Sequence, residues 1–257
     1  MRKLILAYIR FLFKSTNQHG VHSPFVYDLV TKCFYDKTKY AEYEKLGTYR
    51  RSLLKNTDLI AVTDLGVGSQ VMRTNDRKVS DMAKNAGTTP TRAKLLYRLM
   101  KYLNIEKTLE LGTSMGIGTY TMCLANPDGT VTSIEGCPNI SNFSGRFLQN
   151  QGVKNFDLLI GDFGQILKTL DHDYFDLIFI DGNHDMQATI DYFNTLLPKT
   201  HNDTVMIFDD INWSNGMRDA WAHIANHSKV TVSIDTFFWG IAFFRKEQEK
   251  EHFIIRI

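Results

Sequence analysis

The sequence has 257 residues, a length that favours one large domain, or a core with an appendage, over two domains of equal size. Hydrophobic residues make up 43% of the chain and charged residues 23%, which excludes a disordered protein. The formal net charge of +2 offers no general attraction for a polyanion, so no nucleic-acid partner is expected. The charge is uneven, because residues 1–60 hold 11 basic and 5 acidic side chains, whereas residues 61–257 hold 19 and 23.

The first 14 residues combine a basic start with an apolar run. Arg10 interrupts the run, no small-residue cleavage site follows it, and it is too short to span a bilayer. We therefore expect a buried or surface-lying amphipathic helix, with peripheral membrane contact as the alternative, and no transmembrane segment. Cys33, Cys123 and Cys137 have neither paired nor metal-type spacing, which favours a reducing compartment and a cytoplasmic protein.

Residues 1–105 are predicted to form an N-terminal helical cap. Helical patterns run over residues 4–13, 25–34 and 91–103, and a polar middle rich in Lys and Tyr joins them. Within this region residues 66–89 are polar and contain glycine, which suits either a loop near a functional site or a plain connector.

Residues 106–257 are predicted to form an α/β domain, because short apolar runs ending in Gly, Asp or Glu alternate with helix-length amphipathic stretches. The expected strands are 108–111, 130–135, 156–160, 175–180 and 204–208, and helices start near residues 116, 140, 163, 186 and 214. Strands 230–234 and 240–244 are too close for a crossover helix and should pair antiparallel. The expected fold is a Rossmann-like, doubly wound, mostly parallel seven-stranded sheet with one antiparallel strand, and residues 252–257 are a candidate for a further edge strand.

Ligands of open α/β sheets bind at the carboxyl ends of the strands. The first run closes with Glu110-Leu-Gly112-Thr-Ser-Met-Gly116-Ile-Gly118, where glycine permits a tight turn and a close approach of a ligand to the backbone. The spacing G-x-x-x-G-x-G fits neither the dinucleotide fingerprint nor the phosphate loop, which disfavours NAD and ATP. A single glycine-rich turn is also compatible with a purely structural role.

Acidic residues close the following runs. Glu135 can accept hydrogen bonds from both hydroxyls of a ribose, with a solvated strand end as the alternative. Gly161 and Asp162 place a carboxylate and backbone N–H groups where they could form hydrogen bonds with the edge of an adenine. The last two runs close with acids as well: Asp181, and the pair Asp209 and Asp210.

In this order and spacing, the segments ELGTSMGIGT, SIEG, IGDF, DLIFIDGNHD and VMIFDDINW resemble class I S-adenosylmethionine-dependent methyltransferases. Within that superfamily the chain is most similar to the metal-assisted small-molecule O-methyltransferases of the catechol and sugar kind. The resemblance covers residues 91–246, and residues 19–25 also resemble an N-terminal element of some bacterial members. The string at residues 64–69 imitates a second cofactor turn, but no acid-ended strand follows at the right distance, so we assign it to a loop or substrate lid.

The resemblance implies S-adenosylmethionine as the cofactor. The residues it assigns to the methionine-binding turn are Glu110, Gly112, Thr113, Ser114 and Gly116. Glu135 would hold the ribose hydroxyls, and Gly161, Asp162 and Phe163 would contact the adenine. Asp181 is expected both at the cofactor and as a catalytic residue.

The resemblance also implies a divalent cation on Asp181, Asp209 and Asp210. A hard cation lowers the pKa of a coordinated hydroxyl, and three carboxylates suit Mg²⁺, Mn²⁺ or Ca²⁺ better than Zn²⁺. The alternative is that Asp209 caps the following helix and Asp181 only ends its strand. The catechol enzymes carry Asn in place of Asp210 and a catalytic Lys in place of His184, so His184 is either the general base or a helix cap.

The expected activity is O-methylation of a small hydroxylated acceptor with divalent-metal assistance. Methyl transfer is an in-line displacement, so the protein must align and deprotonate the acceptor. One alternative is a metal-independent methyltransferase acting on nitrogen or on a larger acceptor; another is a cofactor-binding module without catalysis. An NAD-linked oxidoreductase is a third, which the glycine spacing disfavours. The acceptor is the expected partner, and a homodimer is left open.

Overall fold

The computed structural model describes residues 2–63, 74–85, 87–171 and 174–257. The contacts between Cα atoms divide the chain into two units. Unit 1 comprises residues 1–36 and 171–257, and unit 2 comprises residues 37–170. The division into a cap over residues 1–105 and a domain over residues 106–257 remains a prediction, and the string at residues 64–69 lies outside the described residues.

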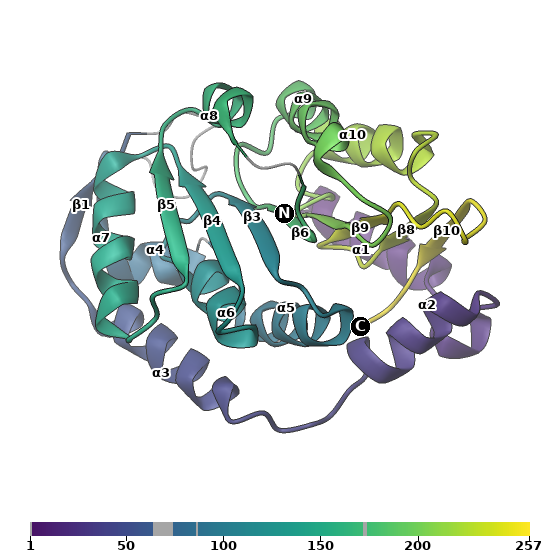
Figure 1. Cartoon of the computed structure of the whole chain (residues 1–257), viewed down its shortest axis with the longest axis horizontal. Helices are drawn as coiled ribbons and strands as arrows, with labels where there is room; N and C mark the ends of the chain where they lie inside the picture. Colours follow the sequence, from purple (N-terminus) through teal and green to yellow (C-terminus); the bar gives the residue numbers. More distant parts are fainter. Residues whose placement is uncertain (1, 64–73, 86, 172–173) are drawn as a thin grey trace. The chain divides into compact units, whose positions relative to one another are not determined.

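Unit 2 is built on three parallel strands in the order β5-β4-β3. They are β3 (Lys107–Leu111), β4 (Thr130–Glu135) and β5 (Phe156–Ile160), followed by helices α6 (Ile117–Ala125), α7 (Pro138–Asn150) and α8 (Phe163–Thr169). The register places Leu111 beside Ile134 and Glu135 beside Ile160, so the carboxyl ends of the three strands meet at one edge. Figure 1 shows α7 alongside β5 in this unit. The predicted strands and helix starts of this region are confirmed to within a few residues.

The first part of unit 2 holds more regular structure than the sequence predicted. Its elements are α3 (Glu42–Lys55), β1 (Leu59–Ala61), β2 (Asp76–Lys78), α4 (Val79–Asn85) and α5 (Pro90–Leu103). The polar middle of this region contains a helix that the sequence did not predict, α3, which buries Leu46, Tyr49 and Leu53 on one face. The predicted helix over residues 91–103 is confirmed as α5, which Thr89 caps by accepting a hydrogen bond from the Arg92 N–H at 3.4 Å.

Unit 1 holds five strands in the order β10-β8-β9-β7-β6. They are β6 (Leu177–Ile180), β7 (Val205–Phe208), β8 (Val232–Asp235), β9 (Gly240–Phe243) and β10 (Glu251–Ile254). β9 runs antiparallel to β8, as predicted, and it also runs antiparallel to β7. β10 pairs parallel with β8, so the further edge strand expected within residues 252–257 is present. Among the described residues β3 to β10 are therefore eight strands, one more than the seven predicted. The α/β Rossmann-like fold class is confirmed.

The N-terminal helices belong to the same unit as the C-terminal strands. The helices of unit 1 are α1 (Arg2–Lys14), η1 (Gln18–Gly20), α2 (Pro24–Leu29), η2 (Val30–Phe34), α9 (Met186–Leu196), η3 (Leu197–Lys199) and α10 (Asn215–Asn226). Thr16 forms a parallel bridge with Ile255, and the Tyr35 hydroxyl donates to the Arg256 carbonyl at 2.6 Å. Among the described residues, no helix has the length and hydropathy needed to cross a membrane.

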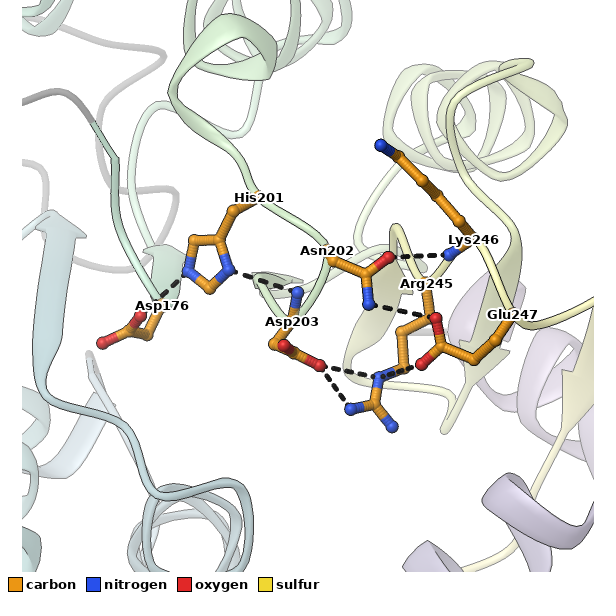
Figure 2. Close-up of polar contacts among 7 residues, drawn as sticks. All are labelled: Asp176, His201, Asn202, Asp203, Arg245, Lys246 and Glu247. Carbon is orange, nitrogen blue, oxygen red and sulfur yellow. Dashed lines mark hydrogen bonds and ion pairs between the residues drawn. The ribbon is translucent and has the colours of Figure 1, made fainter.

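A polar network joins the loops before β6 and β7 to the segment after β9 (Figure 2). His201 contacts Asp176 at 2.9 Å, and Asp203 accepts hydrogen bonds from Arg245. Asn202 donates a hydrogen bond to Glu247 and accepts one from the Lys246 N–H, and Arg245 also forms an ion pair with Glu247. Because β6 and β7 begin here, the network lies at the end opposite to their carboxyl termini, where it links the loops to one another.

Candidate active site

The turn after β3 has a backbone that requires glycine. Gly112 has φ +103° and Gly116 has φ +69°, both in the left-handed region that L side chains rarely adopt. Ser114 between them has φ +46°. The Gly112 N–H donates to the Ile134 carbonyl of β4 at 2.9 Å, which fixes the start of the turn. The turn leads directly into α6, so its backbone can lie close to a ligand.

The side chain of Glu135, at the carboxyl end of β4, is held against this turn. The Ser114 N–H donates to its Oε2 at 2.9 Å, and the Cys137 N–H donates to its Oε1 at 3.0 Å. The Ser144 hydroxyl of α7 donates to the Ser114 carbonyl at 2.5 Å, so the residue that binds the carboxylate is itself fixed. Glu135 is half-buried. Each carboxylate oxygen has more than one lone pair and can therefore accept a further hydrogen bond from a ligand.

Glu110 lies beneath the turn rather than on it, with only 1% of its surface exposed. Its Oε2 accepts hydrogen bonds from the Thr119 hydroxyl at 2.5 Å and the Ser133 hydroxyl at 2.6 Å. Thr113 extends the chain, because its hydroxyl lies 2.6 Å from that of Ser133. Burial raises the pKa of the Glu110 carboxyl to about 7, although the two hydroxyls act in the opposite direction. The carboxyl thus supports the turn from inside, and its predicted contact with a cofactor stays a prediction.

The end of β5 lies beside the end of β4. The Gly161 N–H donates to the Glu135 carbonyl at 3.0 Å, and Gly161 has φ +152°. Asp162 is the N-cap of α8, since its Oδ1 accepts a hydrogen bond from the Gln165 N–H at 3.0 Å. Half-buried Phe163 begins the same helix. The residues predicted to contact an adenine therefore share the edge with Glu135, and one oxygen of Asp162 is used in capping.

Tyr49 is a residue of this edge that the sequence reasoning missed. It comes from α3, is fully buried, and donates a hydrogen bond from its hydroxyl to the Met115 carbonyl at 2.9 Å. A Cβ at Gly116 would lie 2.7 Å from this hydroxyl, so Tyr49 also closes the space beside that glycine. Its signal in the sequence was the spacing of Leu46, Tyr49 and Leu53, which forms a buried helical stripe.

In unit 1, the acids Asp181 and Asp209 follow neighbouring strands. The register of β6 and β7 sets Ile180 beside Phe208, and the Asp209 N–H donates to the Ile180 carbonyl at 2.9 Å. Asp209 is 4% exposed, whereas Asp181 and Asp210 are half-buried. Asp210 has φ +52°. Within the described part of the chain, no three His, Cys, Asp or Glu side chains are grouped so as to hold a metal ion. The assignment of a metal ion to Asp181, Asp209 and Asp210 therefore stays a prediction, since in this structure their side chains are not grouped to hold an ion.

The helix-cap alternatives for Asp209 and His184 are not met, because other residues cap those helices. Asp185 caps α9 by accepting a hydrogen bond from the Ala188 N–H at 3.0 Å. Ser214 caps α10 by accepting one from the Met217 N–H at 3.0 Å. His184 is half-buried next to Asp185, and its role as general base stays a prediction.

Residues 109–211 match the model of a family described as a methyltransferase domain. Over this stretch, the chain is similar to methyltransferase domains. The matched range begins within β3 and ends after β7, so it includes every residue that the sequence predicted for the site, from Glu110 to Asp210. Among curated proteins no sequence relative is found.

The fold of most of the chain is shared with solved structures. The O-methyltransferase TomG of Streptomyces achromogenes, solved with SAM, has a TM-score of 0.58 at 18% identity, over 84% of this chain and 95% of its own. An O-methyltransferase of Bacillus cereus, solved with SAH, has a TM-score of 0.56 at 18% identity, and the match covers 83% of this chain and 95% of its own. The SAH-bound methyltransferase PaMTH1 of Podospora anserina has a TM-score of 0.60 at 13% identity, and the match covers 88% of this chain and 97% of its own. At these identities the likeness establishes the class I methyltransferase fold.

Proposed function

We propose that the protein is an S-adenosylmethionine-dependent methyltransferase that methylates a hydroxyl of a small molecule. The observation that carries the proposal is the pairing of the glycine turn with Glu135, whose carboxylate accepts the Ser114 N–H at 2.9 Å. A carboxylate fixed in this position presents acceptors for two adjacent hydroxyl groups, which is the recognition that a ribose needs. The solved O-methyltransferases with SAM or SAH that share the fold support the same cofactor.

The residues of unit 2 fit this cofactor. Gly112 is half-exposed and has no side chain, which leaves room for a ligand along the turn. In the proposed complex, Thr113, Ser114 and Gly116 bind the methionine part of the cofactor, Glu135 holds the ribose hydroxyls, and Gly161, Asp162 and Phe163 contact the adenine. Glu110 supports the turn through Thr119 and Ser133.

The reaction needs a group that receives the proton of the acceptor. When bound, the cofactor supplies an electrophilic methyl group; the acceptor oxygen forms the new O–C bond as the S–C bond breaks, and S-adenosylhomocysteine leaves. We assign proton acceptance to His184 and alignment of the acceptor to Asp181. A divalent cation, most simply Mg²⁺, would lower the pKa of the acceptor hydroxyl, and binding it would require Asp181, Asp209 and Asp210 to converge from their present arrangement, in which they are not grouped to hold an ion.

The cofactor assignment is tested by titration calorimetry of the full chain with S-adenosylmethionine. Glu135→Ala should weaken binding by about 1–3 kcal/mol, because a charged hydrogen bond to the ribose is lost. Gly112→Val should abolish binding, because a β-branched side chain is incompatible with φ +103° and fills the ligand's space. Asp157→Ala, which removes an exposed carboxylate on β5, is the matched control. Unchanged affinity in Glu135→Ala would refute the ribose assignment.

Acceptor and metal are tested by turnover on a panel of hydroxylated small molecules, with and without a chelator. Metal assistance predicts that chelation and Asp181→Asn each abolish turnover, and that added Mg²⁺ restores the chelated wild-type enzyme but not the variant. Turnover that survives chelation would favour the metal-independent alternative. Cofactor binding without turnover across oxygen and nitrogen acceptors would favour a binding module.

A further inference from the structure

Helix α1 exposes most of its apolar side chains. Ile5, Ile9 and Phe13, which are spaced four residues apart and so form one row along the helix, are 54%, 43% and 87% exposed. The neighbouring apolar side chains are exposed as well: Leu4, Leu6, Tyr8 and Leu12. Only Phe11 of this helix is classed as buried among its described side chains. So many large apolar side chains on one exposed helix mark a surface that binds something.

α1 packs on the rest of unit 1 through buried Phe11 and through one part of the ring of half-exposed Tyr8, so the exposed row belongs to a fixed helix. Tyr8 and Phe11 pack on Phe237, with ring centroids 4.8 Å and 5.5 Å away. Phe237 in turn contacts Phe238, which is 44% exposed. The apolar surface therefore continues from the helix onto the loop after β8.

The charges of α1 are all of one sign. Its sequence, RKLILAYIRFLFK, holds four basic residues and no acidic one. Arg10 and Lys14 are exposed and lie one helical turn apart, in a row that begins with Leu6. This row borders the apolar row, so two cations lie along its edge. Long basic side chains at the edge of an apolar face can reach charged groups while their stems lie on apolar material.

We propose that α1 binds the surface of an anionic lipid bilayer, with the row Ile5, Ile9 and Phe13 inserted below the headgroups. An apolar face bordered by cations complements acyl chains and negative headgroups at the same time. A second copy of the chain fits less well, because it would set two helices of the same positive charge against each other. With 13 residues, α1 is about 20 Å long, which is too short to span a bilayer and suits a helix that lies flat.

The test is co-sedimentation of the full chain with vesicles of phosphatidylcholine alone and of phosphatidylcholine with phosphatidylglycerol. The wild-type chain should bind the anionic vesicles at least about tenfold more tightly than the neutral ones, and added salt should weaken this binding. The double variant Ile9→Ser/Phe13→Ser should lose about tenfold or more in binding to anionic vesicles. Arg10→Gln/Lys14→Gln should lose most of the preference for anionic lipid.

Two controls distinguish binding by α1 from nonspecific binding through any exposed apolar side chain or any exposed cation. Leu59→Ser replaces an exposed apolar side chain on β1, and Lys37→Gln/Lys39→Gln removes two exposed cations outside α1; both should bind vesicles as the wild type does. Circular dichroism and the melting temperature establish that each variant is folded. No vesicle binding by the wild-type chain would overturn the proposal. So would a concentration-dependent dimer that Ile9→Ser/Phe13→Ser disperses while vesicle binding stays absent.

Discussion

At the scale of single residues, the glycine turn after β3 depends on one buried acid. Glu110 is enclosed by β3, β4 and α6, and its carboxyl is bound by the hydroxyls of Thr119 and Ser133. Two hydroxyls do not replace the hydration that a carboxylate loses on burial, so the pKa of Glu110 rises to about 7. This acid therefore titrates near neutrality in the folded protein.

The raised pKa of Glu110 makes stability depend on pH. Folded Glu110 keeps a proton that the unfolded chain, with a pKa of 4.5, releases, so the free energy of unfolding falls as pH rises from 4.5 to about 7. Glu110→Gln has a neutral side chain and should lack this slope. The unfolding free energy of the variant minus that of the wild type should therefore be on the order of 3 kcal/mol larger at pH 8 than at pH 4. Urea unfolding measured across this range checks it, with the exposed Asp157→Asn as control. Parallel pH profiles for wild type and Glu110→Gln would contradict the assignment.

Tyr49 provides a second residue-scale prediction. Its hydroxyl donates to the Met115 carbonyl within the protein interior, at 2.9 Å. Tyr49→Phe leaves that carbonyl without this donor, so we expect a loss of about 1–2 kcal/mol in unfolding free energy. Tyr27→Phe, at a side chain that is 45% exposed, should change stability little. Equal effects of the two substitutions in denaturant unfolding would show that the buried hydrogen bond contributes nothing.

At the scale of elements, the approach of α10 to β9 requires a glycine. Trp221 of α10 lies over Gly240, and a Cβ at Gly240 would come within 2.4 Å of the indole ring. Trp221 is 6% exposed and its ring is rigid, so it has little room to move aside. The glycine thus determines how closely the helix packs on the sheet.

Gly240→Ala should therefore overpack this contact and lower the free energy of unfolding by about 1–3 kcal/mol. The same substitution at Gly47 is the matched control, since the nearest group there is the end of the flexible Arg51 side chain, at 3.1 Å. Alanine is the better helix former, so Gly47→Ala should be neutral or stabilising by up to about 1 kcal/mol. Thermal unfolding of both variants is the measurement. Destabilisation by Gly240→Ala but not by Gly47→Ala would show that the steric contact with Trp221 is the cause, and equal destabilisation would contradict this.

At the scale of the whole molecule, the proposed cofactor should stabilise the folded chain. A ligand at a hundredfold excess over its dissociation constant adds about 2.7 kcal/mol to the free energy of unfolding. For a chain of this length, S-adenosylmethionine should thus raise the melting temperature by about 5–10 °C. Glu135→Ala should show a smaller rise at the same cofactor concentration. ATP and NAD should produce none, because the glycine spacing suits neither of them, and a rise with NAD would contradict the cofactor assignment.

Local patterns in the sequence were sufficient to predict most of the α/β fold. β4 and β5 begin and end where their apolar runs predict, and Thr89 and Pro90 mark the start of α5, because strand hydrophobicity and helix capping act over a few neighbouring residues. The glycine turn and the acids at the strand ends could be identified for the same reason. α3 was missed, although Leu46, Tyr49 and Leu53 have helical spacing, because the polar residues between them dominate the composition of the segment.

Tertiary structure decided what the local patterns left open. It placed Glu110 inside the protein, beside Thr119 and Ser133, and it joined Glu135 to the Ser114 N–H across two strands. It also paired residues near both termini, at Thr16 and Ile255, and left the apolar row of α1 exposed. Burial, pKa and exposure depend on neighbours that are far away in the sequence. They are therefore properties of the packed chain, whereas turns and caps are properties of adjacent residues.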